Sequence, residues 1–154
     1  MPSIIKEADV KLYIAGKGPY TEILKKLVEK LNLNKKIVFT SFVSKKKLVN
    51  LYRMCDVFVH PSLSEGYCHT ILEAMSVGRP VVCTDDFGSE MVKEGYNGYV
   101  VSQPEPDLLA EKILDLIFDD NKRCLFGKRS RKIVERDYDW NKIINKLIKI
   151  FKNL

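Results

Sequence analysis

Three short apolar runs lie between residues 56 and 101, and each is followed by a loop rich in glycine, serine, proline or acidic residues. The first run, residues 57–59, favours a strand, and Pro61 must end it because proline lacks the N–H that a central strand uses. A helical spacing of apolar residues follows Gly66 and stops at Gly78. The stretch therefore predicts a strand, a loop and a helix in immediate succession.

The second apolar run, residues 80–84, predicts the next strand. Two strands joined so closely by a helix imply a parallel, right-handed crossover. Ligands of open parallel sheets gather at the carboxyl ends of the strands. Glu65, in the loop, and Glu73, inside the helix, both fall at that edge.

The rest of the chain continues the alternation of strands and helices. Further strands are predicted at residues 10–15, 37–40 and 99–101, each followed by a helix, and Ser44 is the predicted N-cap of the second helix. With 45% hydrophobic and 30% charged residues, the composition is that of one globular domain. We therefore predict an α/β fold for residues 1–154, built on an open parallel sheet with helices on both faces.

The start of the helix after Gly66 suits a phosphate group. The backbone N–H groups of about residues 67–71 have no acceptor within the helix, and the positive end of the helix dipole adds to their attraction for an anion. Glu73 lies about one helical turn further on, and Glu65 stays outside the helix. Because carboxylates accept hydrogen bonds from hydroxyls, the two glutamates predict a sugar on each side of a phosphate, which is the layout of a nucleotide diphosphate sugar.

Two other loops are candidates for ligand contact. Gly16-Lys17-Gly18-Pro19 follows the first predicted strand, where a short glycine loop can approach phosphate or sugar closely, and a plain strand-to-helix turn is the simpler alternative. Residues 85–90 follow the strand at 80–84 at the same sheet edge. Glu90 in that loop is either a substrate contact or an acid in the first turn of a helix.

Several motifs occur in the order in which one enzyme family has them: Pro61-Ser62, Ser64-Glu65-Gly66-Tyr67, Leu72-Glu73-Ala74-Met75, Gly78-Arg79-Pro80-Val81-Val82, Glu90 and Asn97-Gly98. In these motifs the chain resembles the second domain of retaining glycosyltransferases of the GT-B fold, family 4 (glycosyl transferases group 1). The resemblance implies a Rossmann-like, donor-binding domain. It also implies transfer of a sugar from a nucleotide diphosphate sugar to an acceptor hydroxyl, with retention of configuration.

The resemblance also implies roles for single residues. In that family the glutamate matched by Glu73 binds the ribose hydroxyls of the donor, and the one matched by Glu65, the expected catalytic residue, contacts the transferred sugar. The predicted donor-binding residues are Gly16, Gly18, Gly66, Tyr67, Cys68, His69, Thr70, Ile71 and Glu73. No cofactor and no metal are expected besides the nucleotide-sugar substrate.

The chain departs from the family pattern in two places. Cys68-His69-Thr70 stands where the family usually has Gly-Leu-Pro, which leaves the donor sugar open. Only nine residues precede Val10, so we expect these 154 residues to lack the acceptor domain and the first strand and helix of the donor domain. We predict that the chain alone is inactive and needs an N-terminal Rossmann-like partner, fused or separate.

Other functions remain open at this stage. A non-catalytic nucleotide- or sugar-binding module is the main alternative to an enzyme. A metal site is another, because four possible ligands fall near the same edge, although without a standard spacing: His60, Cys68, His69 and Cys83. The net charge of +6 is the one feature that favours nucleic acid, and no recognisable motif supports it.

The last predicted helix carries an apolar stripe of Trp140, Ile143, Ile144, Leu147, Ile148 and Phe151. Packing in the core is the simpler explanation of this stripe, and membrane contact is the other. The four cysteines show no close paired spacing, and no signal peptide or apolar run of 18 residues is present. We therefore expect a cytoplasmic protein, with peripheral contact at the inner face of the membrane as an open option.

Overall fold

The computed structural model describes residues 1–63, 66–85, 87–102 and 105–153. The chain divides into two compact units, Met1–Leu51 and Tyr52–Leu154. Glu65, the predicted catalytic residue, lies outside the described residues.

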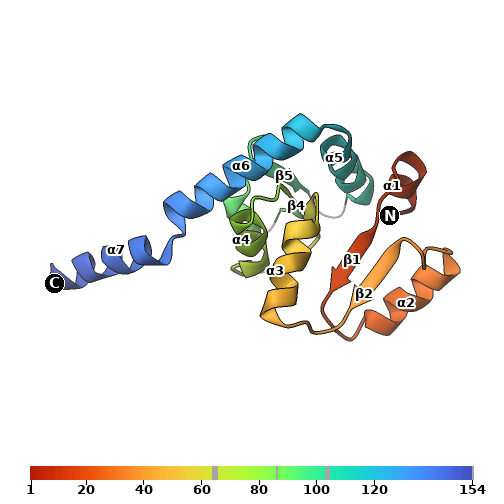
Figure 1. Ribbon diagram of the computed structural model, residues 1–154, viewed down its shortest axis with the longest axis horizontal. Helices are drawn as coiled ribbons and strands as arrows, with labels where there is room; N and C mark the ends of the chain where they lie inside the picture. The colour runs from red at the N-terminus through yellow and green to blue at the C-terminus, as the bar shows by residue number, and fades with distance from the viewer. Residues whose placement is uncertain (64–65, 86, 103–104, 154) are drawn as a thin grey trace. The chain divides into compact units, whose positions relative to one another are not determined.

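The first unit is a small parallel α/β unit that holds α1 (Pro2–Glu7), β1 (Leu12–Ala15), α2 (Thr21–Lys30), β2 (Ile37–Thr40) and the start of α3 (Lys45–Met54) (Figure 1). β1 and β2 pair in parallel, with Leu12 opposite Ile37, which confirms the two predicted strands. Ser44 Oγ accepts a hydrogen bond from the backbone N–H of Lys47, at 3.4 Å. Ser44 is thus the N-cap of α3, as its sequence position predicted.

The second unit contains a three-stranded parallel sheet with helices around it. Its elements are β3 (Phe58–His60), α4 (His69–Ser76), β4 (Val81–Thr84), η1 (Phe87–Met91), β5 (Gly98–Val101), α5 (Pro106–Phe118), α6 (Asp120–Asp137) and α7 (Trp140–Lys152). The strand order is β3-β4-β5, and Phe58 lies opposite Val81. The parallel crossover predicted from β3 through α4 to β4 is confirmed.

The core of the second unit lies around β4, the central strand. All four residues of β4 are buried, as expected for a continuous apolar run between two neighbouring strands. α4 packs against α6, and α5 packs against β4 and β5. The core side chains include Ile71, Met75, Val81, Cys83, Val92 and Ile133. The α/β class is therefore confirmed, with parallel sheets flanked by helices.

Gly127 is the point of closest approach between α6 and the end of α4. A Cβ atom at Gly127 would lie 2.2 Å from the carbonyl oxygen of Gly78, well inside contact distance. Gly78 itself, just after α4, has a φ of 77°, which glycine adopts without strain. The two glycines therefore allow the backbones of α4 and α6 to touch.

We predict that Gly127→Ala destabilises the protein by about 1–3 kcal/mol, because the backbone at Gly78 cannot move aside as a side chain could. Helix propensity alone predicts the opposite sign, a gain of about 1 kcal/mol. Chemical denaturation followed by circular dichroism measures the difference. Lys128→Ala, at the exposed neighbouring position, is the control and should change stability by less than about 0.5 kcal/mol. A stabilised Gly127→Ala protein would contradict the close contact.

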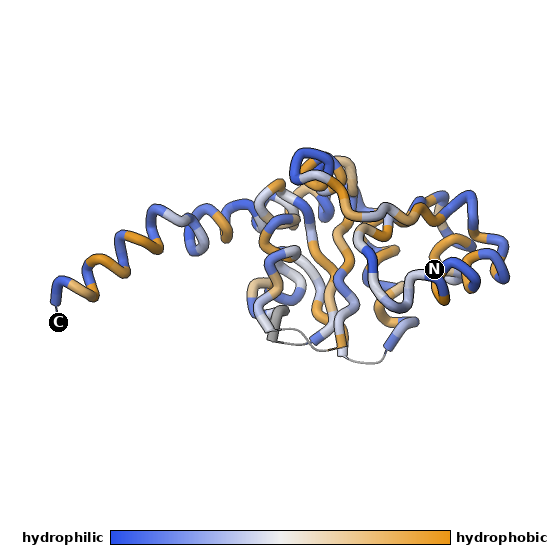
Figure 2. The backbone as a smooth tube through the Cα atoms, turned by 90° about the horizontal axis from the view of Figure 1, so that it is seen from below, coloured by the Kyte–Doolittle hydropathy of each residue, from blue (hydrophilic) through white to orange (hydrophobic). Residues whose placement is uncertain are grey.

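α7 has no buried residue, so the expectation that its apolar stripe packs in the core of this chain is wrong. Trp140 is 73% exposed and Phe151 72% exposed. Figure 2 shows apolar and polar residues alternating along this last helix, and Figure 1 shows it beyond the end of α6. Among the described residues, no helix is both long and apolar enough to span a membrane.

Candidate functional site

The carboxyl ends of β3 and β4 are joined by one side chain, Thr84, the last residue of β4. Its hydroxyl donates a hydrogen bond to the carbonyl oxygen of Ser62, and a second contact of 3.5 Å joins it to the carbonyl oxygen of His60. The chain leaves the sheet after His60, where Pro61 predicted that it must. Thr84 thus fixes the start of the loop that leads into α4.

The first turn of α4 is the position predicted to bind a phosphate. The helix begins at His69, two residues later than predicted, and Cys68 is its N-cap. The Cys68 side chain makes no capping hydrogen bond to the helix. The N–H groups of residues 69–71 lack an acceptor within the helix, and the positive end of the helix dipole lies beside them. This end of α4 is therefore suited to a phosphate.

The predicted donor-binding residues of this segment differ in what they can offer a ligand. Cys68 and Ile71 are buried, at 3% and 0% exposure, so only their backbone groups can reach a ligand. Tyr67, His69 and Thr70 are exposed, and the rings of Tyr67 and His69 meet edge-on at 5.2 Å. The residues that replace the usual family sequence thus divide into one buried thiol and two exposed polar side chains.

The buried Cys68 thiol lies in a small polar cluster. Its Sγ is 3.2 Å from Nε2 of His60 and 3.0 Å from Oγ1 of Thr70. His60 and Cys68, two members of the predicted metal set, therefore come together, and Cys83 lies opposite His60 in the paired strands. The described residues contain no group of three or more His, Cys, Asp or Glu that could hold a metal ion.

Glu73 lies on the exposed face of α4, and a buried side chain, Tyr52, forms a hydrogen bond with its carboxylate. The hydroxyl of Tyr52 donates a hydrogen bond of 2.9 Å to Oε2 of Glu73. Tyr52 is buried, at 7% exposure, and its burial, aided by this hydrogen bond, raises the pKa of the phenol well above its usual value. Tyr52 is a hydrogen-bond donor to Glu73 at neutral pH, as any protonated phenol can be, and the raised pKa extends this to higher pH. Sequence reasoning missed it, because helical spacing places Tyr52 on an apolar face but does not choose its partner.

The predicted glycine loop lies in the first unit. The N–H of Gly16 donates to the carbonyl oxygen of Thr40, and the N–H of Gly18 donates to Oγ1 of Thr21, each at about 3 Å. Gly16 has a φ of 125°, and no atom lies within 4 Å of a Cβ built at either glycine. The loop is open to an approaching ligand, but these two amides are already engaged.

The loop after β4 was the other candidate for substrate contact. Asp85 and Glu90 are exposed, and Glu90 belongs to the short helix η1. Asp86 lies outside the described residues. Contact of this loop with a substrate stays a prediction.

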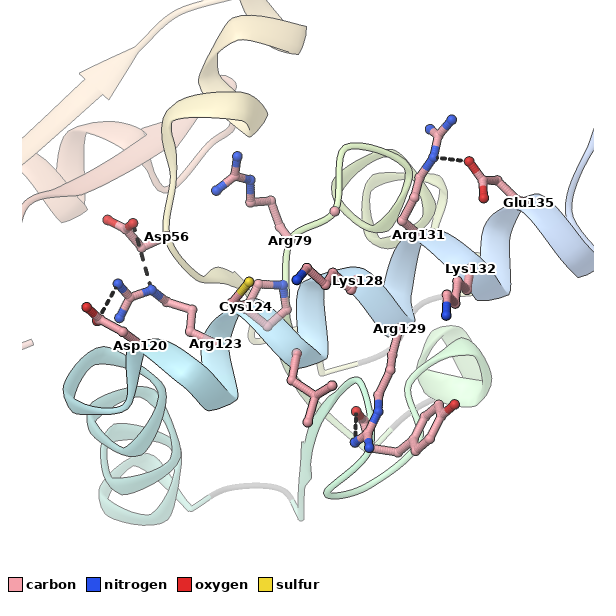
Figure 3. A pocket seen from close by; sticks show the side chains of 14 residues that line it. Asp56, Arg79, Asp120, Arg123, Cys124, Lys128, Arg129, Arg131, Lys132 and Glu135 are labelled. Atoms are coloured by element: carbon pink, nitrogen blue, oxygen red, sulfur yellow. Dashed lines mark hydrogen bonds and ion pairs between the residues drawn. The ribbon is translucent and has the colours of Figure 1, made fainter.

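Figure 3 shows a cleft of about 780 Å³ on the second unit that is not the predicted site. Three of its lining residues come just before β3, β4 and β5, at Asp56, Pro80 and Tyr96, so it lies at the amino ends of the strands. It also borders Gly78 and Arg79, which follow the last turn of α4. The cleft therefore faces the edge of the sheet opposite to the free first turn of α4.

Three of the six cations that line this cleft have partners within the protein. Arg123 contacts Asp120 at 2.7 Å, and Arg131 contacts Glu135 at 2.7 Å, as Figure 3 shows. Arg129 lies over the ring of Tyr96, 4.3 Å from its centre. These contacts give the three arginines a structural role, and cations near the carboxyl end of α4 also suit its dipole. We therefore place the candidate site at α4 and Glu73 rather than in this cleft.

A family model described as "Glycosyl transferases group 1" matches residues 1–133. The chain belongs to this family. The family predicted from the sequence motifs is thereby confirmed.

Relatives in this glycosyltransferase family match almost the whole chain. The uncharacterized glycosyltransferase MJ1607 of Methanocaldococcus jannaschii is 33% identical over 99% of this chain and 39% of its own length. The GDP-mannose-dependent alpha-(1-6)-phosphatidylinositol monomannoside mannosyltransferase of Mycobacterium tuberculosis is 30% identical over 96% of this chain and 40% of its own length. The chain thus spans about two fifths of the relatives that it matches.

Solved structures of GT-B glycosyltransferases share the fold. HepE of Anabaena, in complex with UDP-glucose, superposes with a TM-score of 0.87 at 25% identity, over 99% of this chain and 44% of HepE. The C-terminal domain of the group 1 glycosyltransferase LpcC of Francisella tularensis superposes with a TM-score of 0.80 at 26% identity, over 90% of this chain and 76% of that domain. The chain therefore corresponds to the C-terminal domain of a GT-B glycosyltransferase.

Proposed function

We propose that this chain is the donor-binding half of a retaining glycosyltransferase, which transfers a sugar from a nucleotide diphosphate sugar to an acceptor hydroxyl. The observation that carries the proposal is the start of α4, where the Cys68 side chain makes no capping hydrogen bond, on the same helix as the exposed, hydrogen-bonded carboxylate of Glu73. The UDP-glucose complex of HepE supports a nucleotide sugar as the donor. Retention of configuration rests on the family resemblance.

The diphosphate of the donor would lie on the first-turn amides of α4. Glu73 is four positions after His69, a rise of about 6 Å along the helix axis, which places Glu73 within reach of the neighbouring ribose. As the sugar bond breaks, negative charge grows on the departing diphosphate, and the fixed N–H groups stabilise that charge without reorganising. The amides thus stabilise the leaving group, the diphosphate, in the transition state of the transfer.

The two glutamates divide the remaining work in this proposal. Glu73 accepts hydrogen bonds from the ribose hydroxyls, and Glu65 contacts the transferred sugar and favours the positive charge that develops on it. The role of Glu65 rests on the family resemblance. The acceptor would be bound by an N-terminal Rossmann-like partner, and we assign no general base to this chain. The relatives support such a partner, because this chain covers only 39% of MJ1607 and 44% of HepE.

Calorimetric titration tests donor binding. The panel is UDP, GDP and ADP with their sugar derivatives, and at least one should bind to the isolated chain. Glu73→Gln, which keeps the size of the side chain and removes its charge, should weaken that ligand. Glu111→Gln, at an exposed site on α5, should leave it unchanged. No heat from any member of the panel at millimolar concentration would contradict donor binding.

We predict that the isolated chain self-associates through α7. The apolar stripe of this helix is exposed. Burying such side chains against a second copy of the chain would stabilise the pair by about 25 cal/mol per Å² of apolar surface. Replacing both Leu147 and Phe151 by serine should shift the protein toward monomer in sedimentation velocity.

Lys146→Ser on the polar face of α7 is the matched control and should leave the sedimentation profile unchanged. A wild-type chain that remains monomeric at every concentration measured would refute this prediction.

A further inference from the structure

The hydroxyl of Tyr52 lies beneath the carboxylate of Glu73. The tyrosine is buried at 7% exposure, whereas Glu73 is exposed, so the 2.9 Å hydrogen bond joins a surface carboxylate to the core. An exposed glutamate ordinarily samples several rotamers, and fixing one of them costs about 1–2 kcal/mol. Here the protein itself restricts the rotamers before a ligand arrives.

Tyr52 is itself held by its neighbours. Its ring packs edge-on against Phe58, with ring centres 5.5 Å apart, and Phe58 stacks on the His60 ring at 6.3 Å. Nε2 of His60 in turn contacts Sγ of Cys68, the N-cap of α4. A row of aromatic side chains from α3 and β3 therefore supports both the start of α4 and Glu73.

The bond from Tyr52 leaves the other oxygen of Glu73 available. Among the described residues, no hydrogen bond or ion pair to Oε1 is present. In this bond Tyr52 donates its O–H proton to Oε2, so the proton of the phenol is already used on Glu73. The arrangement directs Oε1 to receive a hydroxyl from outside.

We propose that Tyr52 is a positioning residue that orients Glu73 for the ribose hydroxyls of the nucleotide donor. The proposal rests on the proposed function, in which Glu73 binds that ribose. In this proposal, the preference for ribose over 2′,3′-dideoxyribose depends on Tyr52, although the Tyr52 side chain does not touch the ligand. A purely structural tyrosine would instead affect stability, and affect all ligands equally.

Tyr52→Phe removes the hydroxyl alone, and the readout is the ratio of the affinities for UDP and its 2′,3′-dideoxy analogue. If another nucleotide of the panel binds more tightly than UDP, that nucleotide and its dideoxy analogue are used instead. We expect Tyr52→Phe to bind the ribonucleotide about three- to tenfold more weakly than the wild type does. Its affinity for the dideoxy analogue should equal that of the wild type. In a Glu73→Ala background, which removes the acceptor of the Tyr52 hydroxyl, Tyr52→Phe should have no further effect on ribonucleotide binding.

Tyr99→Phe is the matched control, because the Tyr99 hydroxyl also donates to a carboxylate, that of Asp115 on α5. It removes the same kind of bond away from the site and should leave the affinity ratio unchanged. Thermal unfolding of both variants reports the loss of stability separately from the loss of selectivity.

Two results would overturn the proposal. If the wild type prefers the ribonucleotide and Tyr52→Phe retains the full preference, the proposed function stands and the role of Tyr52 is refuted. If the wild type binds both ligands equally, the ribose role of Glu73 fails and the role of Tyr52 fails with it.

Discussion

Purified alone, the chain is expected to transfer no sugar from any nucleotide diphosphate sugar, and activity should appear when the N-terminal domain is supplied. In the GT-B fold, the acceptor and one wall of the cleft belong to the first domain, so one half can neither position a nucleophile nor exclude water. Positioning of two reactants contributes several powers of ten to the rate. Sugar transfer should therefore be undetectable with the chain alone and readily measured once the N-terminal domain is supplied.

The assay measures sugar transfer and donor hydrolysis with the chain alone and with the upstream domain fused to it or added in trans. The fused protein with Glu73→Ala serves as the inactive control. Robust transfer to a simple acceptor by the 154 residues alone would contradict the division into halves. No transfer by the fused protein, with donor binding intact, would favour a non-catalytic binding module.

The second large effect is expected from the two glutamates. Glu73→Ala should weaken binding of the nucleotide with or without an attached sugar, whereas Glu65→Ala should weaken binding only when the sugar is present. Each lost hydrogen bond to a charged group costs about 1.5–3 kcal/mol, which is roughly 10- to 150-fold in the dissociation constant. Calorimetry with the nucleoside diphosphate and its sugar measures all four combinations.

Glu111→Ala, on the exposed surface of α5, is the control for loss of one carboxylate and should change none of the constants. Equal weakening of the free nucleotide by Glu65→Ala and Glu73→Ala would contradict the division of roles. Such a result would show that neither glutamate distinguishes the sugar from the nucleotide.

The elements that sequence predicts best are those with strong local signals. Pro61 ends β3, Gly78 follows the end of α4, and Ser44 caps α3, because each acts through the backbone of its own neighbourhood. The apolar runs at β3, β4 and β5 predict strands because a buried parallel strand must be apolar throughout. The family motifs then specify an edge of the sheet as the ligand site.

Long-range contacts are what sequence does not reveal. Tyr52 and Glu73 are 21 residues apart, and no periodicity marks them as partners. Cys68 contacts His60 from across the loop, and α7 has an apolar stripe but no buried residue. Such features follow from packing of distant segments, which a pattern within one helix or strand does not specify.

The most direct test of the account is to follow the backbone amide signals of the chain by nuclear magnetic resonance while the nucleotide sugar is added. The account predicts that the largest changes fall on residues 69–71 and on Glu73, at the carboxyl ends of the strands. Changes confined to the cleft around Arg123 and Lys128, or none at saturating ligand, would contradict a donor site at the start of α4.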